Sequence, residues 1–233
     1  QLNDVNEAPE KISFDITSKL EDKWTKLIGG ESSDRSYSLT IDLEGSLYIA
    51  GDTYGEIDNQ KNTQTIDGFI TKLKEDGTKE WTKLLFPLID LDDKTIGKQD
   101  AEQYTTVAVI NTLTTGQDGF IYAGGRLSNN GNEGFLIKLK SDGTKDWAKI
   151  ISSEQSANFF TESDQMDVIE SITYGNDQSI YVAGYLGGDM FDDQIISNEV
   201  ARSAFISKYQ SDGEREWIHF FQPTPILDYK NDR

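Results

Sequence analysis

The chain has 233 residues, of which 41 are acidic and 22 are basic, so its formal net charge is −19. A surface this acidic repels nucleic-acid phosphates and anionic lipid, and no apolar stretch is long enough to cross a bilayer as a helix, so both partners are disfavoured. Cysteine is absent, which excludes disulfides, thiolate metal sites and a cysteine nucleophile.

The first predicted element is a polar linker over residues 1–12, which we expect to follow a preceding domain. Residues 3–9 read Asn-Asp-Val-Asn-Glu-Ala-Pro and resemble the linker that ends cadherin-type repeats, in which oxygen ligands hold calcium between domains. The resemblance implies Asp4, Asn6 and Glu7 as calcium ligands. Calcium takes six to eight oxygens, so a preceding domain would supply the others. The alternative is a plain polar linker that Pro9 stiffens.

Residues 13–233 are predicted to be one region built from a repeat. All four tryptophans stand in the same sequence context, at Trp24, Trp81, Trp147 and Trp217, and they are 57, 66 and 70 residues apart. Between them come, in a fixed order, an extended run, a short aromatic segment that ends in glycine, and a segment that contains a phenylalanine. The repeat predicts units at about 24–80, 81–146 and 147–216, with the start of a fourth at 217–233.

Each unit is expected to supply four strands. The aromatic segments (47–51, 121–125 and 180–184) and the phenylalanine segments (68–73, 134–139 and 204–209) are short and rich in β-branched residues. Glycine, aspartate or asparagine bounds them, which is typical of strands. Asp-Gly at 76–77, 142–143 and 212–213 predicts a tight hairpin before each tryptophan strand.

A sheet of this kind has apolar side chains on both faces and cannot bury both alone. Phe69 and Leu73 are predicted to point to one face and Ile70 to the other. Stacking such sheets around an axis buries both faces, so the predicted fold class is all-β, a partial β-propeller of tandem four-stranded antiparallel blades. Propellers usually have four to eight blades, so either further blades of a parent chain complete the ring or copies associate. We favour further blades.

The combined pattern, Tyr-x-Ala-Gly followed by Gly-Phe and then Asp-Gly with tryptophan, resembles the bacterial β-propeller repeat called SBBP over about residues 24–220. The resemblance implies a multi-bladed propeller within a large secreted or cell-surface protein, with no catalytic residue common to the family. Asp42 matches the first turn of the repeat, but Gly116 and Gly175 stand in its place later, and Gln178 replaces a turn glycine. A ligand role for Asp42 is therefore not expected in every blade.

Few residues are candidates for chemistry. The sole histidine, His219, occupies the place of a lysine in the other units, which indicates a polar strand position and not a catalytic base. Lys72, Lys138 and Lys208 recur in phase and are expected to lie along apolar surface or to pair with carboxylates. The acidic clusters at 90–93 and 189–193 favour solvated loop charge over calcium binding.

These features predict a non-catalytic binding, adhesion or spacer module of a large bacterial protein that is secreted or displayed on the cell surface. Its ligand would be a protein or a glycan, bound by loops at the blade edges, with calcium as the candidate cofactor. The alternative is a propeller-type polysaccharide hydrolase or lyase that uses carboxylates at the channel mouth.

Overall fold

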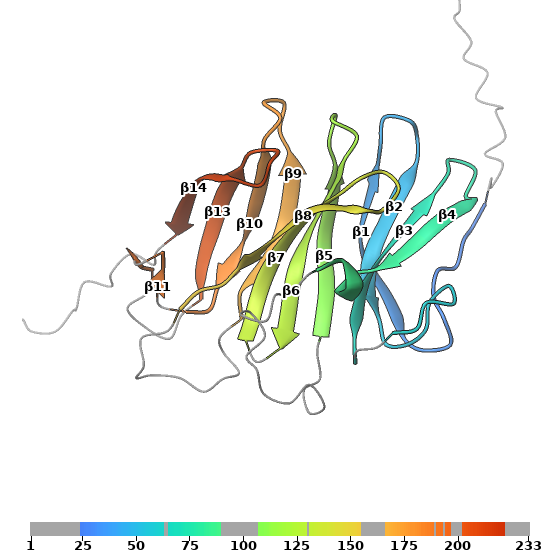
Figure 1. Cartoon of the computed structure of the whole chain (residues 1–233), viewed down its shortest axis with the longest axis horizontal. Helices are drawn as coiled ribbons and strands as arrows, with labels where there is room; N and C mark the ends of the chain where they lie inside the picture. The colour runs from blue at the N-terminus through green and yellow to red at the C-terminus, as the bar shows by residue number, and fades with distance from the viewer. Residues whose placement is uncertain are drawn as a thin grey trace, which may run out of the picture.

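The computed structural model describes residues 24–62, 65–89, 107–129, 131–154, 166–188, 190–192, 194–196 and 202–221. These residues form three four-stranded antiparallel sheets and one small two-stranded sheet (Figure 1). The predicted fold class is therefore confirmed. The described part of the chain contains no helix with the length and apolar character that a membrane crossing requires.

Each large sheet is a meander in which successive strands of the sheet pair side by side, although β11 and β12 intervene between β10 and β13 in sequence. Sheet 1 consists of β1 (Asp34–Ile41), β2 (Leu47–Thr53), β3 (Asp67–Leu73) and β4 (Lys79–Leu84). Sheet 2 consists of β5 (Val107–Thr115), β6 (Ile121–Asn129), β7 (Gly131–Leu139) and β8 (Lys145–Ile151). Sheet 3 consists of β9 (Val168–Tyr174), β10 (Ile180–Leu186), β13 (Ser203–Tyr209) and β14 (Arg215–Phe221). The small elements are η1 (Phe86–Leu88), β11 (Met190–Phe191) and β12 (Gln194–Ile195).

The sheets are offset from the predicted units. The tryptophan strands β4, β8 and β14 are the last strands of their sheets, since each pairs with the phenylalanine strand before it. Residues 217–221 therefore close sheet 3 and do not open a fourth unit. A sequence period gives the spacing of the strands, but it does not say which neighbour a strand pairs with, so the units at 24–80, 81–146 and 147–216 were placed one strand too early.

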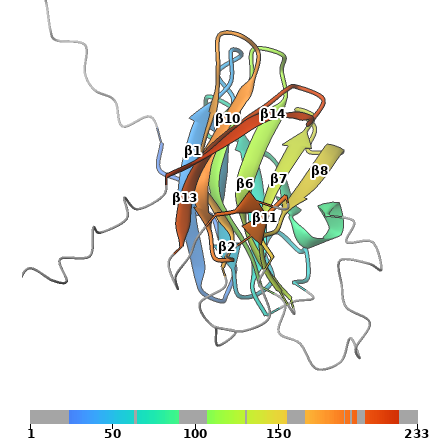
Figure 2. The same ribbon diagram turned by 90° about the vertical axis from the view of Figure 1, so that its left-hand side faces the viewer.

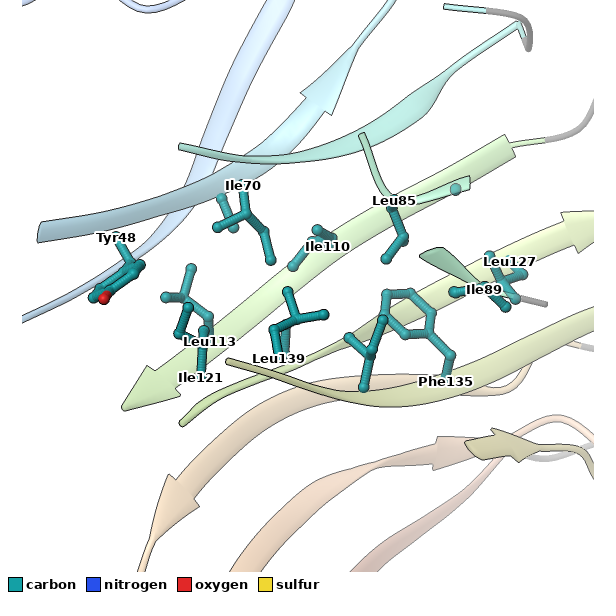
Figure 3. Packing of buried hydrophobic residues seen from close by; sticks show 14 residues of the cluster. Tyr48, Ile70, Leu85, Ile89, Ile110, Leu113, Ile121, Leu127, Phe135 and Leu139 are labelled. Atoms are coloured by element: carbon teal, nitrogen blue, oxygen red, sulfur yellow. The ribbon is translucent and has the colours of Figure 1, made fainter. Parts of the chain in front are cut away.

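The sheets stack face to face, with the first strands β1, β5 and β9 lying next to one another (Figure 1). Ile70 and Tyr48 of sheet 1 pack against Leu139 and Phe135 of sheet 2 in one buried cluster (Figure 3). The other face of sheet 2 packs on sheet 3 through a second cluster, which includes Tyr122, Leu136, Phe205 and Tyr209. Both faces of sheet 2 are thus buried, as the two-sided apolar pattern predicted.

The recurrent glycine within the second strand of each sheet has a specific structural reason. The first strand of each sheet carries an irregularity in its register opposite this glycine. A Cβ atom on Gly51, Gly125 or Gly184 would lie within 2 Å of a carbonyl oxygen on that neighbouring strand. Only glycine therefore permits the close approach of the two backbones, which explains the Ala-Gly signature of the repeat.

Gln178 is a turn residue that glycine should replace with a gain in stability. Its φ is 64°, in the left-handed region, where the equivalent Gly45 and Gly119 have φ of 84° and 80°. A side chain in this region costs roughly 1 kcal/mol, so we expect Gln178→Gly to raise the free energy of unfolding by about that amount in urea titrations. Asn176→Gly is the control, since Asn176 is not at positive φ, and it should give no gain. Equal effects of the two changes would contradict the explanation.

Candidate functional site

The two ends of the sheets differ in their connections. At the end that we call the turn end, the upper end in Figure 1, five-residue turns join the strands at 42–46, 74–78, 116–120, 140–144, 175–179 and 210–214. At the opposite end, the loop end, the connections span 54–66, 85–106, 152–167 and 187–202, whereas one residue separates β6 from β7. The insertions that distinguish the repeats therefore all lie at the loop end.

A buried carboxylate fastens the chain at the loop end of sheet 1. Asp67, the first residue of β3, is 1% exposed and accepts a hydrogen bond of 3.0 Å from the backbone N–H of Phe86, just after β4. Burial raises the pKa of the Asp67 carboxyl to about 6, although backbone N–H groups of Phe86, Gly68 and Leu85 oppose the shift. Asp67 thus holds the base of the long connection that leads to sheet 2.

A second buried carboxylate joins three connecting segments between sheets 2 and 3. Asp167 is 3% exposed and accepts hydrogen bonds from the Ser153 backbone N–H at 2.5 Å, the Ser153 hydroxyl at 2.6 Å and the Gly187 N–H at 2.8 Å. The Ser153 hydroxyl oxygen in turn accepts from the Gly188 N–H at 2.8 Å. Burial raises the pKa of Asp167 even against these hydrogen bonds. The bases of these connections are therefore held together.

Glu133 lies near Asp167, and one oxygen of its buried carboxylate lacks a hydrogen bond from the described residues. It occupies the position in β7 that Asp67 occupies in β3. Burial raises its pKa, and the negative charge of Asp167 raises it further. One of its carboxylate oxygens, Oε2, is buried with no hydrogen-bond partner among the residues that the structure describes. Glu133 and Asp167 are thus a pair of interacting carboxylates at the loop end.

Two exposed side chains at the loop end of sheet 1 offer a surface for contact. The Tyr54 ring is 39% exposed, and the Arg35 guanidinium lies over it at 5.2 Å from the ring centroid. The backbone N–H of Tyr54 donates to the Ser33 carbonyl at 3.0 Å, which fixes the start of the connection. An aromatic face with a neighbouring cation on a fixed loop base is suited to contacts with either a protein or a sugar.

The turn end holds a recurrent tyrosine–aspartate hydrogen bond. The hydroxyl of Tyr48 donates to Asp42 at 3.0 Å, that of Tyr122 to Asp118 at 2.6 Å, and that of Tyr181 to Asp177 at 2.9 Å. The same carboxylates accept backbone N–H groups within their turns. The hydrogen bond from Tyr181 is the main cause that lowers the pKa of Asp177 to about 2.

The later units carry the structural equivalent of Asp42 at a shifted turn position. Gly116 and Gly175 do stand in its place, but the carboxylate enters two positions later, from Asp118 and Asp177. Either turn position brings a carboxylate within reach of the tyrosine. The signal that sequence reasoning missed is the spacing of four residues between aspartate and tyrosine in the later units.

The recurrent lysines lie beside these tyrosine–aspartate pairs. Lys208 Nζ is 2.8 Å from Glu216 and 3.2 Å from Asp177, and these two hydrogen bonds raise its pKa. Lys138 Nζ donates to the Ser211 carbonyl at 2.8 Å and is within 4 Å of Asp118 and Asp146. Lys72 Nζ pairs with Glu80 at 3.0 Å. Of the two arrangements predicted for these lysines, along apolar surface or paired with carboxylates, the structure shows the pairing.

The tryptophans link successive sheets by a hydrogen bond that the sequence did not predict. The indole N–H of Trp81 donates to the Ser141 carbonyl at 3.2 Å, and that of Trp147 to the Ser211 carbonyl at 3.1 Å. Trp24 makes the same contact with the Glu75 carbonyl at 3.0 Å. Each acceptor belongs to an Asp-Gly turn of the next sheet. The glycine leaves room for the ring, because a Cβ on Gly77 would lie 2.6 Å from a Trp24 ring atom.

The link can be tested at Trp147. Phenylalanine keeps most of the ring packing but removes the donor to Ser211, so Trp147→Phe should lower the free energy of unfolding by about 1 kcal/mol. The matched control is Trp217→Phe, since no acceptor for the Trp217 indole lies among the described residues. Urea unfolding of both variants in dilute solution makes the comparison. An equal loss in the two proteins would show that packing, and not the hydrogen bond, is responsible.

The candidate metal ligands receive no structural support. Asp4, Asn6, Glu7 and the cluster at 90–93 lie outside the described residues. In the cluster at 189–193, Asp192 forms an ion pair with Arg215, and Asp189 and Asp193 lie outside. Within the described ranges, no three His, Cys, Asp or Glu side chains are grouped so that they could hold a metal ion. His219 is exposed on β14, with its ring 4.9 Å from that of Trp217.

Comparison with known proteins gives a family match and alignments with solved structures. A search of curated proteins found no match. Among solved structures, a protein of unknown function from Bacteroides caccae aligns with a TM-score of 0.38 and 9% identity over 81% of this chain and 47% of that one. The chain therefore spans about half of that protein. A catalytically inactive virginiamycin B lyase from Staphylococcus aureus, solved with quinupristin, aligns with a TM-score of 0.29 and 15% identity over 86% of this chain and 74% of that one. The family SBBP, described as a beta-propeller repeat, matches residues 23–58, so the segment from Trp24 through β1 and β2 carries the sequence of this repeat.

Proposed function

We propose that the chain is a non-catalytic binding or spacer module of a large bacterial protein that is secreted or displayed on the cell surface, and that its loop end binds a protein or glycan ligand. The observation that carries this proposal is the difference between the two ends of the sheets. All the long connections lie at the loop end, whereas the turn end consists of tight turns. Recognition residues are commonly placed on loops that a rigid scaffold positions.

The buried carboxylates support the proposal because they hold the loop bases in place. Asp67 fixes the segment after β4, and Asp167 joins the segments after β8 and β10. Each carboxylate accepts hydrogen bonds from the backbone of a connecting segment in place of water. These bonds restrict the conformations of the segments before a ligand binds, so binding loses less conformational entropy. A loop end with fixed bases is suited to selective recognition.

Binding to a glycan array, followed by titration calorimetry with any glycan that binds, tests the proposal. Tyr54→Ala removes an exposed ring from the loop end, and we expect it to weaken binding at least tenfold. Leu43→Ala is the matched control, because Leu43 is 84% exposed and lies at the turn end. It should leave binding unchanged. Loss of binding only in Leu43→Ala would place the ligand at the turn end and contradict the proposal.

A second candidate function rests on Glu133 and Asp167. Interacting carboxylates with raised pKa values are the groups that polysaccharide hydrolases use as acid and base. Against this role, Asp167 is 3% exposed and both of its oxygens accept hydrogen bonds from the connecting segments. A screen for polysaccharide cleavage separates the two functions. Turnover that Glu133→Gln abolishes would favour the enzyme and would count against the binding module.

Calcium is the proposed cofactor of the linker, with Asp4, Asn6 and Glu7 as ligands. A thermal melt in millimolar calcium, then in excess chelator, tests this proposal with the intact chain. If the linker binds the ion, chelation should lower Tm, and replacement of the three residues by alanine should remove that response. An unchanged Tm in the wild-type protein would remove calcium from the account of this chain.

A further inference from the structure

The face of sheet 3 that is turned away from sheet 2 has the residues of a buried face. Tyr48 and Tyr122 are 1% and 0% exposed in sheets 1 and 2, while Tyr181 at the same position is half-buried. Ile70 and Leu136 are 1% and 0% exposed, and the equivalent Ile206 is again half-buried. In Figure 2 the viewer looks onto this side of the molecule, with β13 and β14 in front. The residues on this face therefore match those on the faces of sheets 1 and 2 that are each covered by the next sheet.

Two series of hydrogen bonds between sheets stop at the same face. The Ser38 hydroxyl oxygen accepts from the Leu113 N–H at 3.0 Å, and Thr112 Oγ1 accepts from the Ile172 N–H at 3.2 Å. Ser171 is the next member of this series; it pairs with Ala183 in the sheet, but it is exposed and its hydroxyl has no hydrogen bond to a described residue. The tryptophan series ends in the same way at Trp217. Sheet 3 therefore presents the Ser171 hydroxyl oxygen as an acceptor and the Trp217 indole N–H as a donor for hydrogen bonds with a further sheet.

Sheet 1 of the same chain presents the complementary half. Leu39 occupies the position of Leu113 and Ile172, yet its side chain is 58% exposed against 5% and 8%. Its backbone N–H is the equivalent of the two that bind Ser38 and Thr112. Ile41 is also 58% exposed. The large exposed apolar side chains of β1 therefore lie where a preceding sheet would pack.

Trp24 occupies part of the face of sheet 1 that is turned away from sheet 2. Its indole holds the Glu75 carbonyl, the acceptor that corresponds to Ser141 and Ser211 in the other sheets. Trp24 is nevertheless 39% exposed, and Leu27, three residues on, is 93% exposed in a segment without strand pairing. Trp24 thus stands where the tryptophan of a preceding sheet would stand, without the sheet that normally carries it.

We propose that two copies of this chain pack sheet 3 of each onto sheet 1 of the other and so form a closed ring of six sheets. Ser171 then accepts from the Leu39 N–H of the second copy, and the Trp217 indole takes the Glu75 carbonyl from Trp24. A ring of six sheets is within the range of known propellers. A head-to-tail contact that closes after two copies has twofold symmetry and leaves no face uncovered.

The second copy is chosen as the occupant because both halves of the contact are present on one chain. Each copy carries a formal net charge of −19, so repulsion opposes association and salt should strengthen it. Further sheets of a longer chain, the expectation from the sequence, would have to carry the same groups. That occupant is one of the outcomes that the experiment distinguishes.

Light scattering on the full chain, coupled to size-exclusion chromatography, tests the proposal. At 100 μM and 0.5 M NaCl, the expected species has twice the chain mass of 26.2 kDa. Trp217→Ala should weaken the dimer at least tenfold, and Leu39→Glu should give a monomer. Trp24→Ala should strengthen the dimer several-fold, because it removes the competitor for the Glu75 carbonyl. Far-UV circular dichroism of each variant checks that it is folded.

The variants are expected to change the affinity of the dimer in opposite directions. A general loss of folding would therefore not give the expected pattern. A wild-type protein and a Trp24→Ala variant that both stay monomeric would overturn the proposal and would point to sheets supplied by a longer chain. A dimer that survives both Trp217→Ala and Leu39→Glu would overturn it as well, because the contact would then involve another surface. Species larger than a dimer would exclude the closed ring.

Discussion

Replacement of Phe135 by alanine should lower the free energy of unfolding by about 3–5 kcal/mol, the usual loss for a large buried aromatic residue. Phe135 lies on β7, is 0% exposed and packs in the cluster between sheets 1 and 2 (Figure 3). The backbone around it cannot collapse freely into the space, because β7 is paired on both sides by β6 and β8. The cavity should therefore remain largely open.

Urea unfolding followed by tryptophan fluorescence measures this loss, with circular dichroism as a second probe of whether the transition is two-state. Phe221→Ala is the matched control, since Phe221 is also on a strand but is 63% exposed in the single chain. In dilute solution it should change the free energy of unfolding by no more than about 0.5 kcal/mol. A loss below about 1 kcal/mol for Phe135→Ala would contradict the stacking of sheets 1 and 2.

Asp67 should make the protein less stable as pH rises from about 4 to about 6. Its pKa is about 6 in the folded protein against 3.8 for the ordinary carboxyl. Between these values the folded chain binds more protons than the unfolded chain, so the free energy of unfolding falls as pH increases. A shift of about two pKa units corresponds to about 2–3 kcal/mol, which is fully lost only above the folded pKa.

Asp67→Asn isolates this contribution. The asparagine oxygen can still accept the Phe86 N–H but the side chain does not ionise, so the variant should be more stable than the wild type at pH 7 by about 2 kcal/mol. The two proteins should converge near pH 3–4. Unfolding in urea between pH 3 and 8 provides the comparison, because Glu133 and Asp167, whose pKa values are also raised, contribute equally to both proteins.

Asp76→Asn is the control for the sign of this effect. Hydrogen bonds from Thr78 lower the pKa of the exposed Asp76 carboxyl, so its contribution is present above the unfolded pKa and disappears as pH falls. The asparagine variant at position 76 should therefore gain no stability at pH 7. A gain in Asp76→Asn equal to that in Asp67→Asn would show that overall negative charge, and not burial, sets the response.

The candidate site was only partly predictable. The long connections are visible as insertions between the repeats, so the loop end could be anticipated as the variable edge. Asp67 and Glu133 stand directly before the Gly-Phe pairs of the first two units, but the sequence contains many other carboxylates. What distinguishes them is burial. The partners of Asp167, Ser153 and Gly187, come from segments 14 and 20 residues away, and no local pattern announces such contacts.

The sequence by itself determined the strands, the tight turns and the stacking of sheets. Side-chain alternation, β-branched residues and Asp-Gly turns act over a few neighbours, so the linear order of residues contains them. Only the tertiary structure decided that the tryptophan strand closes a sheet, that Asp118 and Asp177 replace Asp42, and that Asp67 and Asp167 hold protons more tightly than ordinary carboxyls. Pairing, hydrogen bonding across sheets and desolvation depend on which groups meet in space, and that arrangement is set by the fold as a whole.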